Sequence, residues 1–127
     1  MKYFLDTSAW IEYFEGGKSG KFVSDLILEV NNEIYTSSIV IAEIASKLKR
    51  KKSNVEQVLE ALKNNALIIE LSPEIAKNAG ILHAETREKI NSFGLMDSLI
   101  ISLARSIKAT LVTKDSHFKS FKEAIIL

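Results

Sequence analysis

The sequence contains no cysteine, only one proline and no apolar stretch long enough to cross a membrane. The absence of cysteine excludes disulfides and thiolate metal sites, and it agrees with a reducing compartment. A signal peptide is not expected either, because Asp6 interrupts the apolar N-terminal residues too early. We therefore expect a soluble, cytoplasmic protein that does not associate with membranes.

An excess of charge of either sign is also lacking. The 127 residues include 17 Lys plus Arg and 16 Asp plus Glu, so the net charge of +1 gives no indication of nucleic-acid binding. Apolar residues make up 46% and charged residues 26%, which is ordinary for a globular protein. The length, without any repeat, low-complexity tract or linker, predicts a single domain over residues 1–127.

Short apolar runs alternate with longer segments of helical period, such as the one in which Val55, Val58, Leu59 and Leu62 share a face. The short runs are continuously hydrophobic, which indicates strands buried on both faces of a parallel sheet beneath helices. The pattern therefore predicts an α/β domain of three layers. The predicted strands are Lys2–Leu5, Glu33–Thr36, Ala66–Leu71, Thr110–Thr113 and Ala124–Leu127.

The acidic residues are distributed unevenly along these elements. Asp6 ends the first predicted strand, Asp115 follows the strand that ends in LVT, and Asp97 begins an apolar helix. Only Asp25 falls on a solvated helix face. Most glutamates are also on polar faces, but Glu43 is surrounded by apolar residues in SSIVIAEIASKL. Four carboxylates thus occupy positions where water is not the expected neighbour.

These four positions can meet at one rim of the sheet. Ligand sites of open α/β sheets form outside the carboxyl ends of the strands, where Asp6 and Asp115 lie. Clustered carboxylates repel one another unless cations compensate, and a site made only of oxygen ligands selects Mg²⁺ or Mn²⁺. A carboxylate-held metal is suited to phosphoryl chemistry, because it activates water and neutralises charge on the phosphate.

Each acid also has a structural explanation of its own. Asp6 and Asp115 could cap helices, and Asp97 could cap a helix over Ser98–Ile107. Glu43 could pair with a buried lysine or arginine, because a lone buried acid is costly. The four together favour the metal site over four independent structural roles.

The pieces FLDTSAWIEYF, SSIVIAEI, FGLMDSLIISLA and LVTKDSHF resemble the PIN-domain family, in the family's order and spacing over essentially the whole chain. The resemblance is strongest to the small VapC-type ribonuclease toxins. It implies a three-layer α/β/α sandwich with a mostly parallel five-stranded sheet. It also implies that Asp6, Glu43, Asp97 and Asp115 are the catalytic, metal-binding acids.

Further expectations follow from the same resemblance. Thr7 and Thr113 fall at the family's hydroxyl positions near the metal ions. Members are usually Mg²⁺- or Mn²⁺-dependent endoribonucleases, and VapC-type proteins commonly form homodimers that a cognate antitoxin inhibits by occupying the cleft. We therefore expect an RNA substrate, an antitoxin partner and a dimer.

A basic run, KLKRKK, ends the segment that carries Glu43. Its charge complements a helix dipole and keeps the turn soluble. Alternatively, Lys49, Arg50 and Lys51 contact the RNA backbone near the acids. His83 and His117 have no metal-ligand spacing, so we assign them surface or core roles.

The pattern as a whole predicts a metal-dependent endoribonuclease, the toxin of a type II toxin–antitoxin pair. One alternative is a PIN-like RNA-processing nuclease outside any toxin system, and another is a non-catalytic PIN-like binding module. A phosphoacceptor signalling domain ranks below these, because it needs a pair of acids after the first strand and this chain has only Asp6 there.

Overall fold

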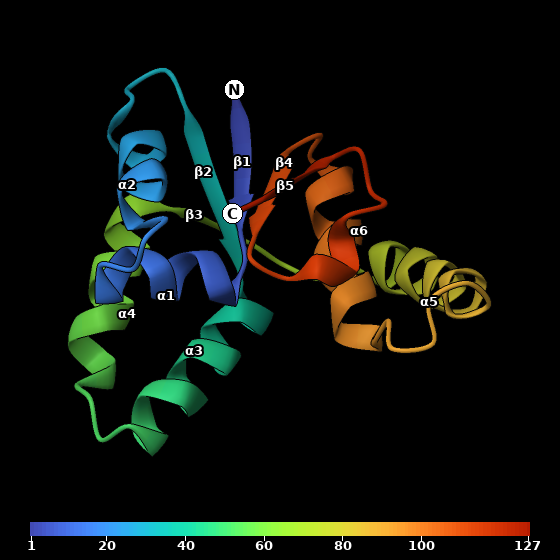
Figure 1. Ribbon diagram of the computed structural model, residues 1–127, viewed down its shortest axis with the longest axis horizontal. Coiled ribbons are helices and arrows are strands. Elements are labelled where there is room, and N and C mark those ends of the chain that lie inside the picture. The colour runs from blue at the N-terminus through green and yellow to red at the C-terminus, as the bar shows by residue number, and fades with distance from the viewer.

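The computed structural model describes residues 1–127 and contains five strands, six α-helices and one short 3₁₀ helix (Figure 1). The elements follow one another as strand, two helices, strand, two helices, strand, two helices and two final strands. In chain order they are β1 Lys2–Leu5, α1 Thr7–Glu15, α2 Gly20–Leu28, β2 Glu33–Ser37, α3 Ser38–Arg50, α4 Val55–Asn65, β3 Leu67–Ile69, α5 Pro73–Arg87, α6 Leu95–Ser106, β4 Thr110–Thr113, η1 Ser116–Phe118 and β5 Ala124–Ile126.

All strands are parallel, in the order β3-β2-β1-β4-β5, which confirms the predicted sheet. In the centre, Phe4 of β1 is paired with Tyr35 of β2 on one side and with Leu111 of β4 on the other. The predicted strand Ala66–Leu71 is shorter than expected, because only Leu67–Ile69 pairs with β2 at this edge of the sheet. No helix is long and apolar enough to span a bilayer.

The strand order reverses direction between β1 and β4. The chain moves from β1 to β2 and β3 with α1 to α4 as connections, and then returns past β1 to β4 through α5 and α6. Right-handed crossovers therefore place α1 to α4 on one face of the sheet and α5 with α6 on the other, as Figure 1 shows. Such a reversal is where open α/β sheets form their ligand crevice.

The hydrophobic core is one cluster of 20 buried residues that spans the sheet and both helical layers. Trp10 of α1 is fully buried and stacks on Phe14 with ring centroids 5.8 Å apart. On the other side Phe93 stacks on Phe121 at 5.5 Å. The aromatic residues of α1 thus contribute to the core, which holds α1 and the residue before it, Asp6, in place.

The start of α6 tests the alternative in which Asp97 only caps a helix. In that alternative the helix begins at Ser98 with Asp97 as its cap, whereas the observed helix begins at Leu95, directly after Gly94. Asp97 is therefore inside the first turn, and its Oδ2 accepts the Gly94 N–H at 3.0 Å. The capping alternative was wrong about the helix start, because Gly94 takes the N-cap position and the acid three residues later accepts its N–H.

Two leucines in strands provide a test of where the stability resides. Leu111 of β4 is fully buried, whereas Leu67 of the edge strand β3 is 57% exposed. We expect Leu111→Ala to lower the free energy of unfolding by about 3 kcal/mol, because it leaves a cavity in the core. Leu67→Ala, the matched control, should lower it by less than about 1 kcal/mol. Urea titrations of both variants measure this, and equal losses would contradict the assignment of the core.

Candidate active site

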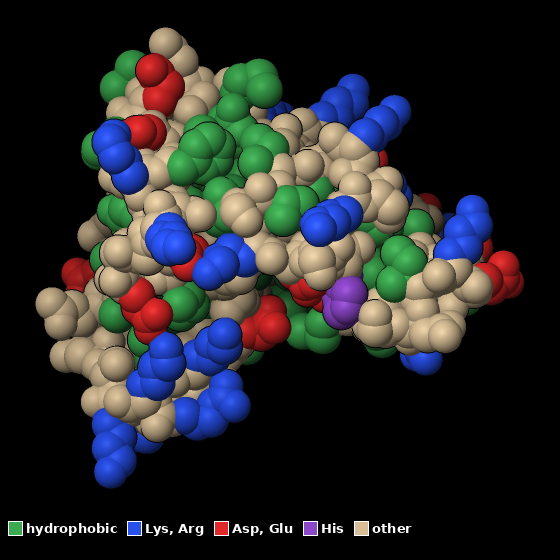
Figure 2. All heavy atoms as spheres, viewed as in Figure 1, with side chains coloured by type: hydrophobic (Ala, Val, Ile, Leu, Met, Phe, Trp, Pro, Cys, Tyr) green, Lys and Arg blue, Asp and Glu red, His purple; other side chains and the backbone are tan.

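A cleft of about 500 Å³ opens where the sheet order reverses, and the four predicted acids all line it. Asp6 comes from the end of β1, Glu43 from α3, Asp97 from α6 and Asp115 from the turn after β4. In Figure 2 acidic side chains gather in the hollow of the face shown, and basic side chains crowd beside it over the end of α3. The cleft thus brings together residues separated by up to 109 positions in the chain.

The Asp6 carboxylate is the most buried of the four, and its residue is only 8% exposed. Its Oδ1 accepts hydrogen bonds from the Ser8 hydroxyl at 2.7 Å and from the Ala9 N–H at 3.0 Å. Its Oδ2 accepts a short hydrogen bond from the Thr113 hydroxyl. Burial nevertheless raises the pKa of Asp6, and the negative charge of Asp115 adds to the rise, while these hydrogen bonds only partly oppose it.

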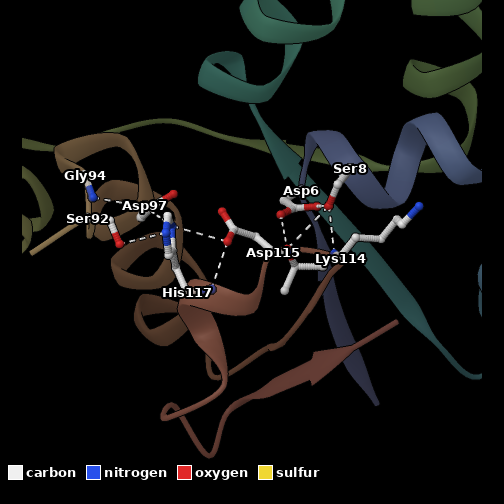
Figure 3. Close-up of polar contacts among 9 residues, drawn as sticks. Asp6, Ser8, Ser92, Gly94, Asp97, Lys114, Asp115 and His117 are labelled. Atoms are coloured by element: carbon white, nitrogen blue, oxygen red, sulfur yellow. Dashed lines mark hydrogen bonds and ion pairs between the residues drawn. The ribbon is translucent and has the colours of Figure 1, made fainter. Parts of the chain in front are cut away.

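Hydroxyl groups join the ends of β1 and β4 around Asp6 (Figure 3). The Lys114 N–H donates to Ser8 Oγ at 2.8 Å, and Ser8 in turn donates to Asp6. The Asp115 N–H donates to Thr113 Oγ1 at 3.0 Å, and Thr113 donates to the other Asp6 oxygen. These two series of hydrogen bonds fix the position of Asp115 relative to Asp6.

Asp97 and Asp115 form a second group with His117, as Figure 3 shows. His117 Nδ1 lies 3.2 Å from Asp97 Oδ2 and 3.3 Å from Asp115 Oδ1. Asp115 Oδ1 also accepts the His117 N–H at 2.8 Å, so the single turn of η1 holds this carboxylate and the ring together. One ligand atom from each of the three residues lies within 4.8 Å of the others.

Glu43 is half-buried on the α3 side of the cleft, outside this group of three residues. Its Oε1 accepts the Thr7 hydroxyl at 2.9 Å, and it forms no ion pair. Thr7 and Thr113, the two hydroxyl positions that the resemblance implied, therefore each donate to one of the four acids. The alternative in which Glu43 pairs with a buried cation is not what the structure shows.

Three of the four acids both accept hydrogen bonds at helix N-termini and line the cleft. Asp6 caps α1 through Ala9, Asp115 caps η1 through His117, and Asp97 bonds the N–H of Gly94 before α6. Helix N-termini stabilise negative charge. The capping positions thus help to hold three carboxylates around one cleft.

The basic run is divided by the helical phase of α3. Lys47 and Arg50 line the cleft together with the acids, while Lys51 forms an ion pair with Glu15 at 2.6 Å and Lys49 is exposed away from the cleft. Of the three predicted RNA-contacting residues, only Arg50 is therefore in the cleft. Lys47, the first residue of the same basic run, also lines the cleft and lies one turn after Glu43 on the same face.

Sequence reasoning also missed His117 and Ser8. We assigned His117 to a surface or core role because it is an isolated histidine, but the 3₁₀ turn places it between two of the acids. The only indication in the sequence was the spacing Asp-x-His directly after a strand. Ser8 follows Asp6 by two residues, the spacing at which a hydroxyl bonds the preceding carboxylate.

The residues present fit a divalent cation. Asp97, Asp115 and His117 could each offer one ligand atom to a single ion, and the carboxylates of Asp6 and Glu43 line the same cleft. No lysine or arginine is paired with any of the four acids. Carboxylate oxygens suit Mg²⁺ and Mn²⁺, and an imidazole is compatible with Mn²⁺. Asp97, Asp115 and Asp6, with His117 and Glu43 at the sides, are the candidate holders.

Comparison with known proteins agrees with this picture. The family model described as "PIN domain" matches residues 3–124. The chain is 34% identical to Ribonuclease VapC2 of Rickettsia felis over 125 residues, which cover 96% of this chain and 91% of that protein. It superposes with a TM-score of 0.80 and 29% identity on a chain of the crystal structure of VapBC2 from Rickettsia felis bound to a promoter DNA fragment, over 100% of this chain and 98% of that one. A toxin–antitoxin complex from Klebsiella pneumoniae shares the fold, with a TM-score of 0.76 and 22% identity over 97% and 95% of the two chains.

The raised pKa of Asp6 leads to a prediction for the metal-free protein. A carboxyl whose pKa is raised by folding contributes stability below its unfolded pKa, and this contribution is lost as the pH rises through the folded pKa. Asp6→Asn removes that loss and leaves an amide oxygen to accept the Ala9 N–H. We therefore expect the variant to melt at the same temperature as the wild type or higher, in EDTA near neutral pH.

Asp25→Asn is the control, because Asp25 is exposed and pairs only with Lys21 on the surface. It should leave the melting temperature nearly unchanged. A clear decrease in the melting temperature of Asp6→Asn in EDTA would show that the ionised carboxylate stabilises the fold by itself.

Proposed function

This chain belongs to the PIN-domain family, and we propose that it is a metal-dependent endoribonuclease, the toxin of a type II toxin–antitoxin pair. The observation that carries the proposal is the meeting of Asp6, Glu43, Asp97 and Asp115 in one cleft at the reversal of the sheet order. The name of its relative, Ribonuclease VapC2, supports RNA as the substrate. An enzyme that cleaves RNA in this way would act in the cytoplasm.

Mg²⁺ or Mn²⁺ would be held by Asp97, Asp115 and Asp6, with Glu43 at the edge of the site. Such a cation supplies a Lewis acid that polarises the phosphate and activates water. The chain's own residues prepare the site before any cation binds. Ser8 and Thr113 fix both oxygens of Asp6, and the Gly94 N–H fixes one oxygen of Asp97.

The basic residues at the edge of the cleft would bind the phosphates of the RNA substrate. Lys47 and Arg50 line the same cavity as the acids. An RNA strand that lies along α3 would therefore place one phosphate beside these two residues and the following phosphate near Asp97 and Asp115. Asp97 and Asp115 keep 22% and 35% of their side chains exposed. An internal segment of a single strand or loop can therefore reach them, which supports internal cleavage.

A cognate antitoxin is the partner that this proposal implies, and we expect it to cover the cleft. Two solved structures of the same fold come from VapBC2 and from a toxin–antitoxin complex, which supports such a partner for this chain. We also propose a homodimer. A PIN-like RNA-processing nuclease outside any toxin system uses the same cleft, whereas a non-catalytic binding module would not cleave RNA.

The test of the function uses purified protein, a single-stranded or loop RNA, and Mn²⁺ or Mg²⁺. We expect internal cleavage that stops when EDTA is added and that decreases by at least about a hundredfold in Asp97→Asn, because one carboxylate of the metal site is lost. Asn can still accept the Gly94 N–H, so the helix start is preserved. Added Mn²⁺ should also raise the melting temperature less in this variant than in the wild type.

Asp25→Asn serves again as the matched control and should cleave like the wild type. EDTA-resistant cleavage by a rigorously pure sample would contradict the metal mechanism. Normal cleavage by Asp97→Asn with an unchanged Mn²⁺ shift would leave Asp97 with a helix-capping role alone.

The basic residues of α3 allow a second test, of the RNA path. Each phosphate contact on a single strand contributes about 0.7 to the slope of log K against log salt. Lys47→Gln combined with Arg50→Gln should therefore reduce the slope by about 1.4, because both residues line the cleft. Lys49→Gln combined with Lys51→Gln, the matched control, should reduce it less, because Lys51 is paired with Glu15 and Lys49 lies outside the cleft. Binding is measured by fluorescence anisotropy in EDTA, and equal slopes for the two double variants would exclude this path.

A further inference from the structure

His117 is the one basic side chain whose nitrogen lies against the acids of the cleft. Its Nδ1 faces Asp97 Oδ2 at 3.2 Å and Asp115 Oδ1 at 3.3 Å, and the ring is 34% exposed. The other ring nitrogen, Nε2, lies 3.0 Å from the Ser92 hydroxyl. Both nitrogens thus have defined neighbours from three elements of the chain: α6, the turn after β4 and the loop before α6.

The two nitrogens are arranged as in a metal-bound histidine. A histidine ligand binds the ion through one nitrogen and donates the other N–H to an oxygen that fixes the tautomer and the ring orientation. If Nδ1 faces the ion, Nε2 carries the proton and donates it to Ser92 Oγ, which can accept it. The oxygen that such a ligand requires is therefore already in place.

The local backbone also restricts where the ring can go. Asp115 Oδ1 accepts the His117 N–H at 2.8 Å within η1, and Phe118 next to it is buried in the core. His83, the only other histidine, provides a contrast, because it lies on α5 and its Nε2 is buried without a hydrogen-bond partner. Only His117 combines a fixed ring with carboxylate oxygens at Nδ1.

We propose that His117 is a nitrogen ligand of the divalent cation that the proposed function places between Asp97 and Asp115, and that Ser92 orients its ring. This inference rests on the proposed metal site and changes its chemistry. Carboxylate oxygens alone suit Mg²⁺, whereas an imidazole nitrogen favours Mn²⁺ and later transition ions. His117 thus makes the site selective for Mn²⁺ over Mg²⁺.

The direct test detects nitrogen bound to manganese, with no RNA present. The full-length protein is loaded with Mn²⁺, and electron spin echo spectroscopy records the ¹⁴N coupling of a coordinated imidazole. We expect this coupling in the wild type and in His83→Gln, and its loss in His117→Asn. The asparagine can offer an oxygen near the position of Nδ1, so the site itself is retained in this variant.

Metal affinities measured by calorimetry give a second readout. We expect His117→Asn to lose about tenfold in Mn²⁺ affinity and less than about threefold in Mg²⁺ affinity. Ser92→Ala should keep the ¹⁴N coupling and weaken Mn²⁺ binding by up to about tenfold, because it removes the partner of Nε2.

The outcomes separate this inference from the proposed function. Mn²⁺ that binds tightly without ¹⁴N coupling, or with coupling that survives in His117→Asn, overturns the ligand role of His117 and leaves the carboxylate site intact. A wild-type protein that binds no Mn²⁺ overturns the metal site as a whole. An equal loss of Mn²⁺ and Mg²⁺ affinity in His117→Asn would overturn the selectivity.

Discussion

The burial of the Asp6 carboxylate between the ends of β1 and β4 is the interaction on which the rest of the site depends. A buried charge is costly unless hydrogen bonds satisfy it, and three donors, from Ser8, Ala9 and Thr113, surround this one. These donors belong to α1 and β4, so satisfying Asp6 also fixes the two segments relative to each other. The position of Asp115 follows from this constraint, because its N–H bonds the hydroxyl of Thr113.

The groups that satisfy the acids are hydroxyls and backbone N–H groups rather than lysines. Lys114 lies in sequence between Thr113 and Asp115, yet its ammonium is held at 2.5 Å by Glu12, on the far side of the turn. Glu12 can take this position because residue 17 is a glycine. A Cβ atom on residue 17 would lie 2.1 Å from Glu12 Oε2. The Lys114 ammonium is therefore paired with Glu12 and with none of the four acids of the cleft.

Much of the fold follows from local sequence, and the errors have specific physical causes. Continuous apolar runs such as KYFL and TLVT identified the buried strands, because parallel strands covered on both faces have no polar side. The capping alternative for Asp97 misplaced the start of α6, because Gly94 takes the N-cap position and Asp97 accepts its N–H. The helical phase that separates Lys47 and Arg50 from Lys49 and Lys51 was available in the sequence but was not applied. The contact of His117 with Asp97 was not available, because it depends on how α6 packs beside β4.

Hydroxyl donors would allow the proposed metal site to keep one structure with and without the ion. A serine or threonine hydroxyl satisfies a carboxylate oxygen without neutralising it, and its hydrogen can rotate to another acceptor. Thr7 on Glu43 and Thr113 on Asp6 are such donors, so a cation can reach these oxygens without a movement of the backbone. His117 has the same position relative to Asp97 and Asp115, but its nitrogen can become a ligand itself, whereas the hydroxyls remain hydrogen-bond donors. On the β1 side, neutral hydroxyl donors therefore hold the carboxylates in position. On the α6 side the carboxylates contact His117, whose nitrogen could change from a hydrogen-bonding partner to a metal ligand.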